Sequence, residues 1–430
     1  QPMSTPQVSS LSPTRPRLVV PDVARGLALL GIAMANVSAA WIITHDRPAS
    51  HFGGIINDSV LDKAAVLFAA LFVHVRGLPM FSTLLGFGVG LIALSLWRRE
   101  FPLRRARLVL IRRYGWLFVF GAVHCIFLFY GDIMIFYGLA GILLALLLPL
   151  SDRALMIVAW ILLALTGLAG LGFGVLGYVE PSLAVNFSAG GMGDPVDTSS
   201  YPHLVGSQFM FFLLQLAGTP LVFFNYLPLM IIGFVWARRG TLGDVASHRT
   251  QLISWCVAGC AVIVLVGLPW GLGSIGVVPE SFAAAGLMAS SFLGVFTGPA
   301  LLAATALALH GVQDRVSGGA TLPRGLWALA ALGKRSMSGY LGQSVLFFAL
   351  VYPFTLNFGP QFGAAGQMAI AFGVWLITLF LACILEARGL PGPFEWLHRR
   401  VSYGKTMRPE PTPRLAPGGV KEGVDKQELP

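Results

Sequence analysis

The apolar stretch from residue 121 to 138 contains two ionisable side chains, His124 and Asp132. Ionisable residues are rare inside membrane segments, and they usually serve proton transfer or the binding of ions or substrates. A neutral histidine can accept the proton of a hydroxyl group, and a carboxylate can orient its partner or bind a polar substrate. On one continuous helix the two residues would lie about 12 Å apart and need not touch. The structural alternatives are a hydrogen bond to a neighbouring helix for His124 and solvation at the interface for Asp132.

The first apolar run carries three polar residues on one helical face. Asp22 and Arg25 are three residues apart, which is a spacing that allows an ion pair. Asn36 follows Arg25 by eleven residues, so on a helix it occupies nearly the same face about 16 Å deeper. This stripe is either one wall of a functional site or an interfacial ion pair with a separate hydrogen bond between helices.

Arginine occurs in two settings. Arg76 lies just before the second apolar span, apart from the other basic residues, and is either a donor to a developing oxyanion or an interfacial arginine whose stem lets its charge reach water. Other arginines could bind the phosphates of a ligand, or they could only anchor the topology. These are Arg25, Arg104, Arg105, Arg107, Arg112 and Arg113.

The composition is that of a chain built for lipid. Hydrophobic residues make up 56% and charged residues 11% of the 430 residues, and the mean hydropathy is +0.75. A soluble chain would carry about 25% charged residues. The sequence therefore predicts an all-α integral membrane protein. Runs of roughly 20 apolar residues can cross a bilayer, and about ten are expected, near 25–43, 78–97, 114–130, 132–150, 153–177, 219–237, 251–270, 282–310, 337–356 and 364–386.

Basic residues predict the topology, because Lys and Arg stay on the cytoplasmic side. With both termini in the cytoplasm, all Lys and Arg residues fall in or beside cytoplasmic segments except Arg47, Lys63 and Arg76. The net charge of +10 therefore reflects topology, and no basic patch in a polar domain indicates nucleic-acid binding. The external segments 44–77 and 201–218 are expected to contain amphipathic or re-entrant helices.

A single membrane domain is expected over residues 17–404. The flanking segments 1–16 and 405–430 have too little apolar surface to fold and are expected to be disordered. All four cysteines lie within apolar runs and lack metal-ligand spacing, so the sequence predicts neither a disulfide nor a metal site. They are Cys125, Cys256, Cys260 and Cys383.

Six blocks of the sequence resemble, in order, the YeiB family of bacterial inner-membrane proteins, which contain a domain of unknown function numbered 418. The resemblance runs from about residue 17 to 404 and implies a multi-pass protein of the bacterial inner (plasma) membrane. The blocks are "LVVPDVARGLALLGIAMANV", "RGLPMFSTLLGFGVGL", "RRYGWLFVFGAVHCIFLFYGDIMIFYGLAGILL", "LPLMIIGFVWARRG", "GKRSMSGYLGQSVL" and "GPFEWLHRRVSYG".

That family is distantly similar to the transmembrane acyltransferases, which include heparan-glucosaminide acetyltransferase and the acyltransferase-three enzymes. The shared first-helix pattern falls here on Asp22, Arg25, Gly26 and Asn36. Acyltransferase-three enzymes have a catalytic histidine where this chain has Asn36, and asparagine cannot act as a general base. The resemblance therefore implies His124 as the first candidate for the base and His45 as the second.

The resemblance implies transfer of an acyl group from cytoplasmic acyl-CoA, as co-substrate, to a hydroxyl or amine of an extracytoplasmic or lipid-linked glycan. Asn36 or Arg76 would stabilise the oxyanion, Asp132 would orient a partner or bind the acceptor, and the arginines would bind the phosphates of CoA. Two other functions remain open. Five spans on each side of the long external loop fit a transporter or flippase, and a non-catalytic scaffold would need no base. Membrane lipids are the expected partners, and an oligomer is compatible with the sequence.

Overall fold

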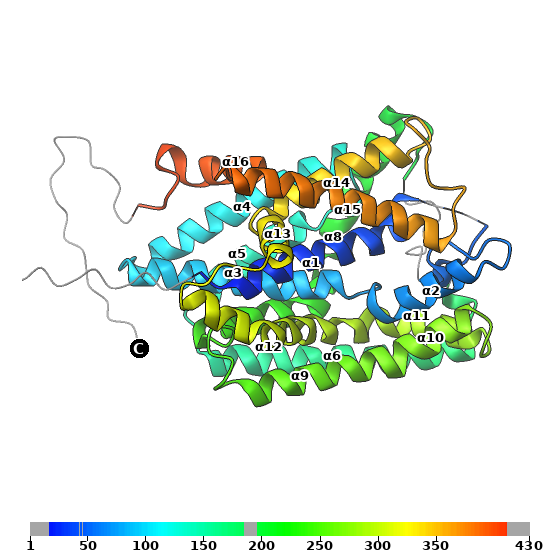
Figure 1. Ribbon diagram of the computed structural model, residues 1–430, viewed down its shortest axis with the longest axis horizontal. Helices are drawn as coiled ribbons and strands as arrows, with labels where there is room; N and C mark the ends of the chain where they lie inside the picture. Colours follow the sequence, from blue (N-terminus) through cyan, green and yellow to red (C-terminus); the bar gives the residue numbers. More distant parts are fainter. Residues whose placement is uncertain (1–16, 43, 45, 185–195, 411–430) are drawn as a thin grey trace, which may run out of the picture.

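The computed structural model describes residues 17–42, 44, 46–184 and 196–410, and all regular structure within them is helical. Figure 1 shows most helices running along the long axis of the molecule. Eight helical segments in this part of the chain are long and apolar enough to cross a membrane, and α5 (Met134–Leu146) and α14 (Ser336–Val351) are shorter apolar helices. Together they coincide with the ten expected spans. The prediction of an all-α multi-pass membrane protein is confirmed.

The eight long segments are built from eleven α-helices and three short helical links. They are α1 (Val19–Asn36) with the π-helical η1 (Val37–Trp41), α2 (Val60–Phe72) with α3 (Gly77–Arg98), α4 (Leu103–Phe127), α6 (Asp152–Val179), α8 (Tyr201–Arg239), α9 (Arg249–Val262) with η3 (Ile263–Gly267) and α10 (Leu268–Ser274), α11 (Ser281–Leu293) with η4 (Gly294–Phe296) and α12 (Thr297–Ser317), and α15 (Ala364–Ala387). Two further helices, α13 (Arg324–Lys334) and α16 (Pro393–Tyr403), lie outside the expected spans.

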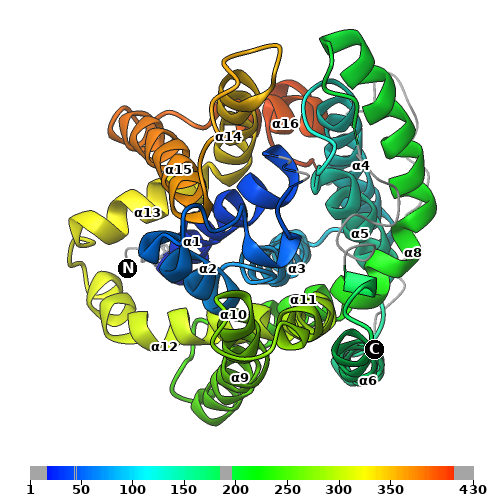
Figure 2. The same ribbon diagram turned by 90° about the vertical axis from the view of Figure 1, so that its right-hand side faces the viewer.

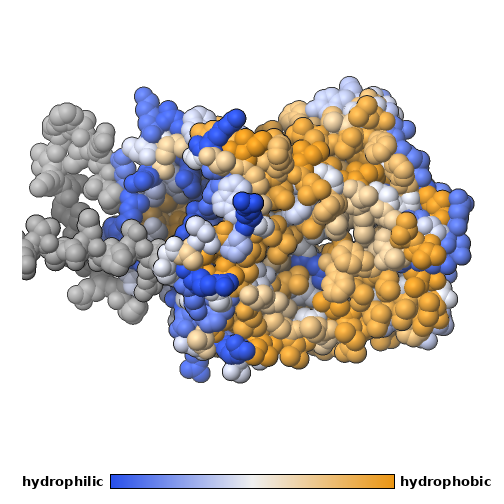
Figure 3. All heavy atoms as spheres, in the orientation of Figure 1, coloured by the Kyte–Doolittle hydropathy of each residue, from blue (hydrophilic) through white to orange (hydrophobic). Residues whose placement is uncertain are grey.

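Helices α1 and α3 lie inside the bundle. Figure 2, viewed along the long axis, shows them surrounded by the other helices. Val20, Ala24 and Leu29 of α1 are almost completely buried. A helix surrounded by other helices needs apolar residues on most of its surface, as the sequence of α1 has. Figure 3 shows a broad hydrophobic belt on the outer surface, with hydrophilic residues gathered at the two ends.

The segments that the charge pattern assigns to the cytoplasm meet at one end of the bundle. Arg238 at the end of α8 donates to Asp152 at the start of α6 over 3.2 Å. Arg99 donates to the carbonyl of Pro409 over 2.6 Å, so the described chain continues against this end beyond residue 404. We call it the basic end and the other the opposite end.

Helix α8 differs from the expectation of a separate segment at 201–218. It is one continuous helix of 39 residues, which at 1.5 Å per residue is about 58 Å long and exceeds the thickness of a bilayer. Pro220 lies inside it. In an apolar environment a broken helix would leave backbone groups without hydrogen bonds, so the helix continues through the proline.

The span expected at 282–310 is also different. It consists of α11 and α12 joined by the tight turn η4. Pro299 has no N–H to donate to the carbonyl of Val295, which weakens the α-helical pattern where η4 occurs. The helix expected within 44–77 is present as α2, which packs against α10 and α15.

Candidate functional site

The connection between α4 and α5 turns the chain back on itself. Helix α4 ends at Phe127, and α5 begins at Met134. Asp132 accepts a hydrogen bond from the backbone N–H of Ile135 through Oδ1 over 2.8 Å. A carboxylate that binds the N–H three residues later is a typical cap at the start of a helix. Asp132 therefore starts α5 as well as carrying a charge.

The same carboxylate contacts His124. Asp132 Oδ2 lies 2.5 Å from His124 Nδ1. Each residue is only 5% exposed, so the pair is removed from water. The expected separation of about 12 Å was wrong, because it assumed one helix from residue 124 to 132. The turn after Phe127 returns the chain toward α4 and brings the two side chains together.

The geometry fixes how His124 can use its second ring nitrogen. A carboxylate accepts hydrogen bonds, so the neutral imidazole donates its Nδ1 proton to Asp132 and carries a lone pair on Nε2. His124 Nε2 is buried and has no hydrogen-bond partner among the residues that the structure describes. A histidine with a carboxylate on one nitrogen and a free lone pair on the other is the arrangement of a general base.

Two residues of α8 hold the connection that carries Asp132. The Tyr201 hydroxyl donates to the carbonyl of Phe127 over 3.0 Å, and Gln215 Nε2 donates to the carbonyl of Tyr130 over 3.0 Å. The first bond satisfies a carbonyl that the end of α4 leaves without a partner, and the second satisfies a carbonyl of the connection itself. The length of α8 beyond the expected span thus has a role, because it covers the turn beside the His124–Asp132 pair.

A glycine allows α4 and α5 to approach at this point. A Cβ added at Gly121 would lie 2.8 Å from Asp132 Oδ1 and would also contact the backbone nitrogen of Ile135. Any side chain at Gly121 would therefore displace the carboxylate or the start of α5. Small residues commonly allow such close packing of membrane helices.

Helix α14 covers the histidine from another side. The ring of Tyr340 lies 5.3 Å from that of His124, measured between centroids, and its hydroxyl donates to the carbonyl of Gly131 over 3.4 Å. Sequence reasoning gave Tyr340 no role in the site. The available signal was the polar hydroxyl of this side chain within an apolar run.

The start of α14 is fixed by α16. Glu395 Oε1 accepts from the backbone nitrogens of Met337 over 3.0 Å and Ser338 over 3.1 Å, and its Oε2 accepts from the Ser338 hydroxyl. A carboxylate at a helix N-terminus is favoured by the helix dipole. Two of the sequence blocks, "GKRSMSGY" and "GPFEW", are thereby joined in one contact that positions Tyr340.

Asn36 ends α1 and is followed by the π-helical turn η1. Trp41, at the end of η1, stacks on Phe129 with 4.2 Å between ring centroids, and Phe129 lies edge-on to His124 at 6.2 Å. The first helix is thus connected to the neighbourhood of the pair through aromatic rings. His45 lies outside the described residues.

Arg76 lies directly before α3 and is 2% exposed. Its guanidinium donates to the carbonyls of Leu71 over 3.0 Å, His74 over 2.9 Å and Val75 over 3.2 Å. These are carbonyls at the end of α2 and in the turn before α3. Arg76 thus closes the end of α2, and among the described residues no carboxylate forms an ion pair with it.

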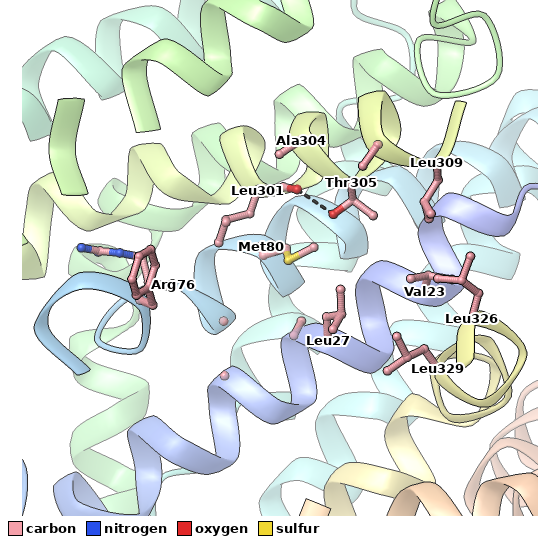
Figure 4. A pocket seen from close by; sticks show the side chains of 15 residues that line it. Val23, Leu27, Arg76, Met80, Leu301, Ala304, Thr305, Leu309, Leu326 and Leu329 are labelled. Atoms are coloured by element: carbon pink, nitrogen blue, oxygen red, sulfur yellow. Dashed lines mark hydrogen bonds between the residues drawn. The ribbon is translucent and has the colours of Figure 1, made fainter. Parts of the chain in front are cut away.

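A largely apolar cavity of about 410 Å³ lies between α1, α3, α12 and α13. Figure 4 shows Leu27, Met80 and Leu329 around it, with the guanidinium of Arg76 directed away from them. Arg76 contributes to the cavity wall but presents its charge elsewhere. The cavity therefore has the character of a site for a hydrocarbon chain.

The structure brings Asp22 and Arg25 together at the basic end. Arg25 Nη1 lies 3.6 Å from Asp22 Oδ1, and Arg17, which sequence reasoning did not include, binds the same carboxylate over 2.8 Å. Asp22 is buried, whereas Arg17 is mostly exposed. Asp22 and Arg25 of the resemblance pattern thus form an ion-pair network with Arg17.

The arginines of α4 are divided between partnered and open positions. Arg107 donates to the carbonyl of Leu146 over 3.0 Å, and Arg113 donates to the Tyr403 hydroxyl over 2.9 Å. Arg104 and Arg105 have no side-chain hydrogen bond in the described part of the chain. Arg112 donates to the carbonyl of Val401 over 3.2 Å, so α16 is held against α4.

The fold and the site define a multi-pass all-α membrane protein with a buried acid–histidine pair. Residues 236–405 match the model of a family described as "Protein of unknown function (DUF418)", the family that the sequence blocks resemble. The chain is also 25% identical over 421 residues to "Uncharacterized protein YxaH" of Bacillus subtilis (strain 168), which covers 92% of this chain and 97% of the relative. The family match includes Tyr340 and Glu395, and the His124–Asp132 pair lies before it.

Proposed function

We propose that the protein is a membrane acyltransferase of the bacterial inner membrane, with His124 as its general base. The observation that carries this proposal is the 2.5 Å contact between His124 Nδ1 and Asp132 Oδ2, together with the unpartnered Nε2 atom. The carboxylate keeps the imidazole in the tautomer that can accept a proton at Nε2. Positioned bases of this kind accelerate reactions by about 10²- to 10⁴-fold.

The reaction moves an acyl group from the sulfur of acyl-CoA to an acceptor oxygen or nitrogen. His124 Nε2 removes the proton of the acceptor hydroxyl as its oxygen attacks the thioester carbonyl. The carbon–sulfur bond then breaks, and the CoA thiolate leaves with the proton that His124 returns. We assign Asn36 as the donor to the oxyanion, because the hydrogen bonds of Arg76 are already used by backbone carbonyls. Asp132 acts on the imidazole rather than on the acceptor.

The positions of the arginines and of His124 along α4 support a donor and an acceptor that enter from different sides of the membrane. The basic end faces the cytoplasm by the charge rule, and acyl-CoA enters there. His124 follows Arg113 by eleven residues on α4 and Arg104 by twenty, which correspond to about 16 Å and about 30 Å along the helix. His124 thus lies toward the opposite end, where a glycan or lipid-linked sugar would enter.

Proton-coupled transport is the second function that the same pair supports, because buried acid–histidine pairs also serve as proton relays in transporters. The two functions differ in one measurable product. An acyltransferase leaves a covalently acylated acceptor and free CoA, whereas a transporter changes only the location of its substrate.

Inverted membrane vesicles that contain the protein test this proposal, because they expose the cytoplasmic face and retain the native acceptors. The vesicles are supplied with acyl-CoA labelled in the acyl group, from acetyl to longer chains, and compared with vesicles that lack the protein. We expect label in a lipid or glycan fraction and release of free CoA only with the protein. Equal labelling of both vesicle types with every donor would contradict acyl transfer and direct the search to proton-coupled uptake.

A further inference from the structure

A second cavity, of about 330 Å³, lies at the basic end between α4, the last residues of α16 and the chain that follows them. Its polar wall consists of Arg105, Arg112, Arg408, Ser402, Tyr403 and Glu410. Sequence reasoning included the first two of these residues among several arginines and assigned no role to the other four. Of the five arginines of α4, Arg105 and Arg112 line this cavity.

The positive charge in this cavity is not neutralised. None of its three arginines forms an ion pair with a carboxylate in the part of the chain that the structure describes. Arg112 is held in place by its hydrogen bond to the carbonyl of Val401. Glu410 also lines the cavity and offsets part of the charge, which leaves an excess of guanidinium groups. Guanidinium groups match phosphate oxygens in charge and geometry.

Two hydroxyl groups add donors to the same wall. Ser402 is 2% exposed, and its Oγ has no hydrogen-bond partner among the described residues. A buried hydroxyl without a partner is costly, so a ligand oxygen at this position would relieve that cost. Tyr403 accepts the hydrogen bond of Arg113, which leaves the proton of its own hydroxyl free to donate.

The remaining wall of the cavity is apolar. Leu108 and Val109 of α4 line it, and Leu108 is 57% exposed. This leucine lies on the outer surface of a membrane-spanning helix. A ligand with a phosphate group and a hydrocarbon chain would thus satisfy both walls.

We propose that this cavity is a binding site for the phosphate group of an amphiphile, which the guanidinium groups of Arg105, Arg112 and Arg408 and the Ser402 hydroxyl recognise. The phosphate belongs either to an anionic phospholipid headgroup or to acyl-CoA. The site does not depend on acyl transfer, because binding requires no turnover.

Binding is measured with the full chain in nanodiscs, and the two phosphate sources are tested separately. Free CoA and palmitoyl-CoA are titrated by calorimetry into protein in phosphatidylcholine nanodiscs. In the second arm, the thermal midpoint is compared between phosphatidylcholine nanodiscs and nanodiscs that also contain phosphatidic acid. The variants are Arg105→Gln and Ser402→Ala, and Arg104→Gln is the matched control because Arg104 is the neighbouring arginine but does not line the cavity.

Loss of one charge-assisted hydrogen bond should weaken binding by about tenfold, which corresponds to about 1.4 kcal/mol. If CoA binding is saturable, and if Arg105→Gln and Ser402→Ala weaken it but Arg104→Gln does not, the result supports the site, with acyl-CoA as the source of the phosphate. Stabilisation by phosphatidic acid that follows the same variants supports a lipid headgroup. Glu410→Gln should tighten either ligand. Absence of both effects, or equal loss in Arg104→Gln, overturns the proposal, and none of these outcomes depends on whether His124 catalyses acyl transfer.

Discussion

Asp132 contacts two groups at once: its Oδ2 atom lies 2.5 Å from His124 Nδ1, and its Oδ1 atom accepts the N–H of Ile135 over 2.8 Å. The cap that starts α5 therefore also fixes the direction of the carboxylate toward His124. Because both oxygens have partners, neither the rotation of Asp132 nor the tautomer of His124 is free. The imidazole of His124 is positioned by the fold before any ligand binds.

Replacing Asp132 with Asn removes the charge while nearly preserving the shape of the side chain. An amide can present its N–H to His124 Nδ1, and the imidazole then carries its proton on Nε2 and cannot act as a base there. We expect acyl transfer to fall by about 10²-fold or more, with normal membrane insertion. The measurement is the initial rate of label transfer in vesicles with matched protein content. A rate close to that of the wild type would mean that Asp132 only caps α5.

Replacing Gly121 with Ala tests whether the close approach of α4 and α5 matters. The added methyl group would lie 2.8 Å from Asp132 Oδ1, so the carboxylate must shift. We expect a destabilisation of about 1–3 kcal/mol and a lower rate at saturating donor. Gly115→Ala is the control on the same helix, because a Cβ there meets nothing within 4 Å. Similar effects of the two substitutions would contradict this interpretation.

Replacing Glu395 with Ala tests the contact between α16 and α14. It removes the acceptor for the backbone nitrogens of Met337 and Ser338. We expect the free energy of unfolding to fall by about 1–3 kcal/mol, seen as a lower thermal midpoint in detergent. Glu100→Ala should leave the midpoint nearly unchanged, since that side chain is exposed and has no hydrogen bond among the described residues.

Acid should release α16 from α4. Burial lowers the pKa of His398 from 6.5 to about 4, and the neighbouring charge of Arg113 acts in the same direction. Between these two pH values, the unfolded or undocked state therefore binds more protons than the docked state. Docking is fully stable above pH 6.5, and it weakens as the pH falls toward 4. At about 1.4 kcal/mol per pKa unit, the effect is on the order of 3 kcal/mol.

Spin labels on α4 and α16 would measure this release as a change in the distance between the two helices. We expect the distance to increase on acidification in the wild type and to change much less in His398→Phe, which retains an aromatic ring but cannot bind a proton. A distance independent of pH in the wild type would contradict the role of His398.

The sequence predicted the membrane spans well because each span needs a long apolar run, and that signal is local. It failed at the His124–Asp132 contact because we took the separation of the two residues along one helix, although the expected spans end at residue 130 and begin again at residue 132. The boundary itself was predicted from "YGDI", where glycine followed by aspartate is typical of a helix end and a new helix start, but the return of the chain toward α4 was not. The Glu395–Ser338 contact joins residues 57 positions apart, and no local pattern indicates such a pairing.

The continuous helix α8 shows a second limit of sequence reasoning. We expected a separate segment at 201–218 and a span from residue 219, but the helix continues through Pro220, because the need to satisfy every backbone group in an apolar environment outweighs the local preference of proline. The support that Tyr201 and Gln215 give to the α4–α5 connection was for the same reason not predicted.

The most direct test of the central claim is the rate of acyl transfer by His124→Gln in vesicles where the wild type is active. Glutamine can still donate a hydrogen bond to Asp132 but cannot accept the proton of an acceptor hydroxyl. We expect a fall of about 10²- to 10⁴-fold, with unchanged protein content and thermal midpoint. A rate equal to that of the wild type would contradict the assignment of His124 as the base.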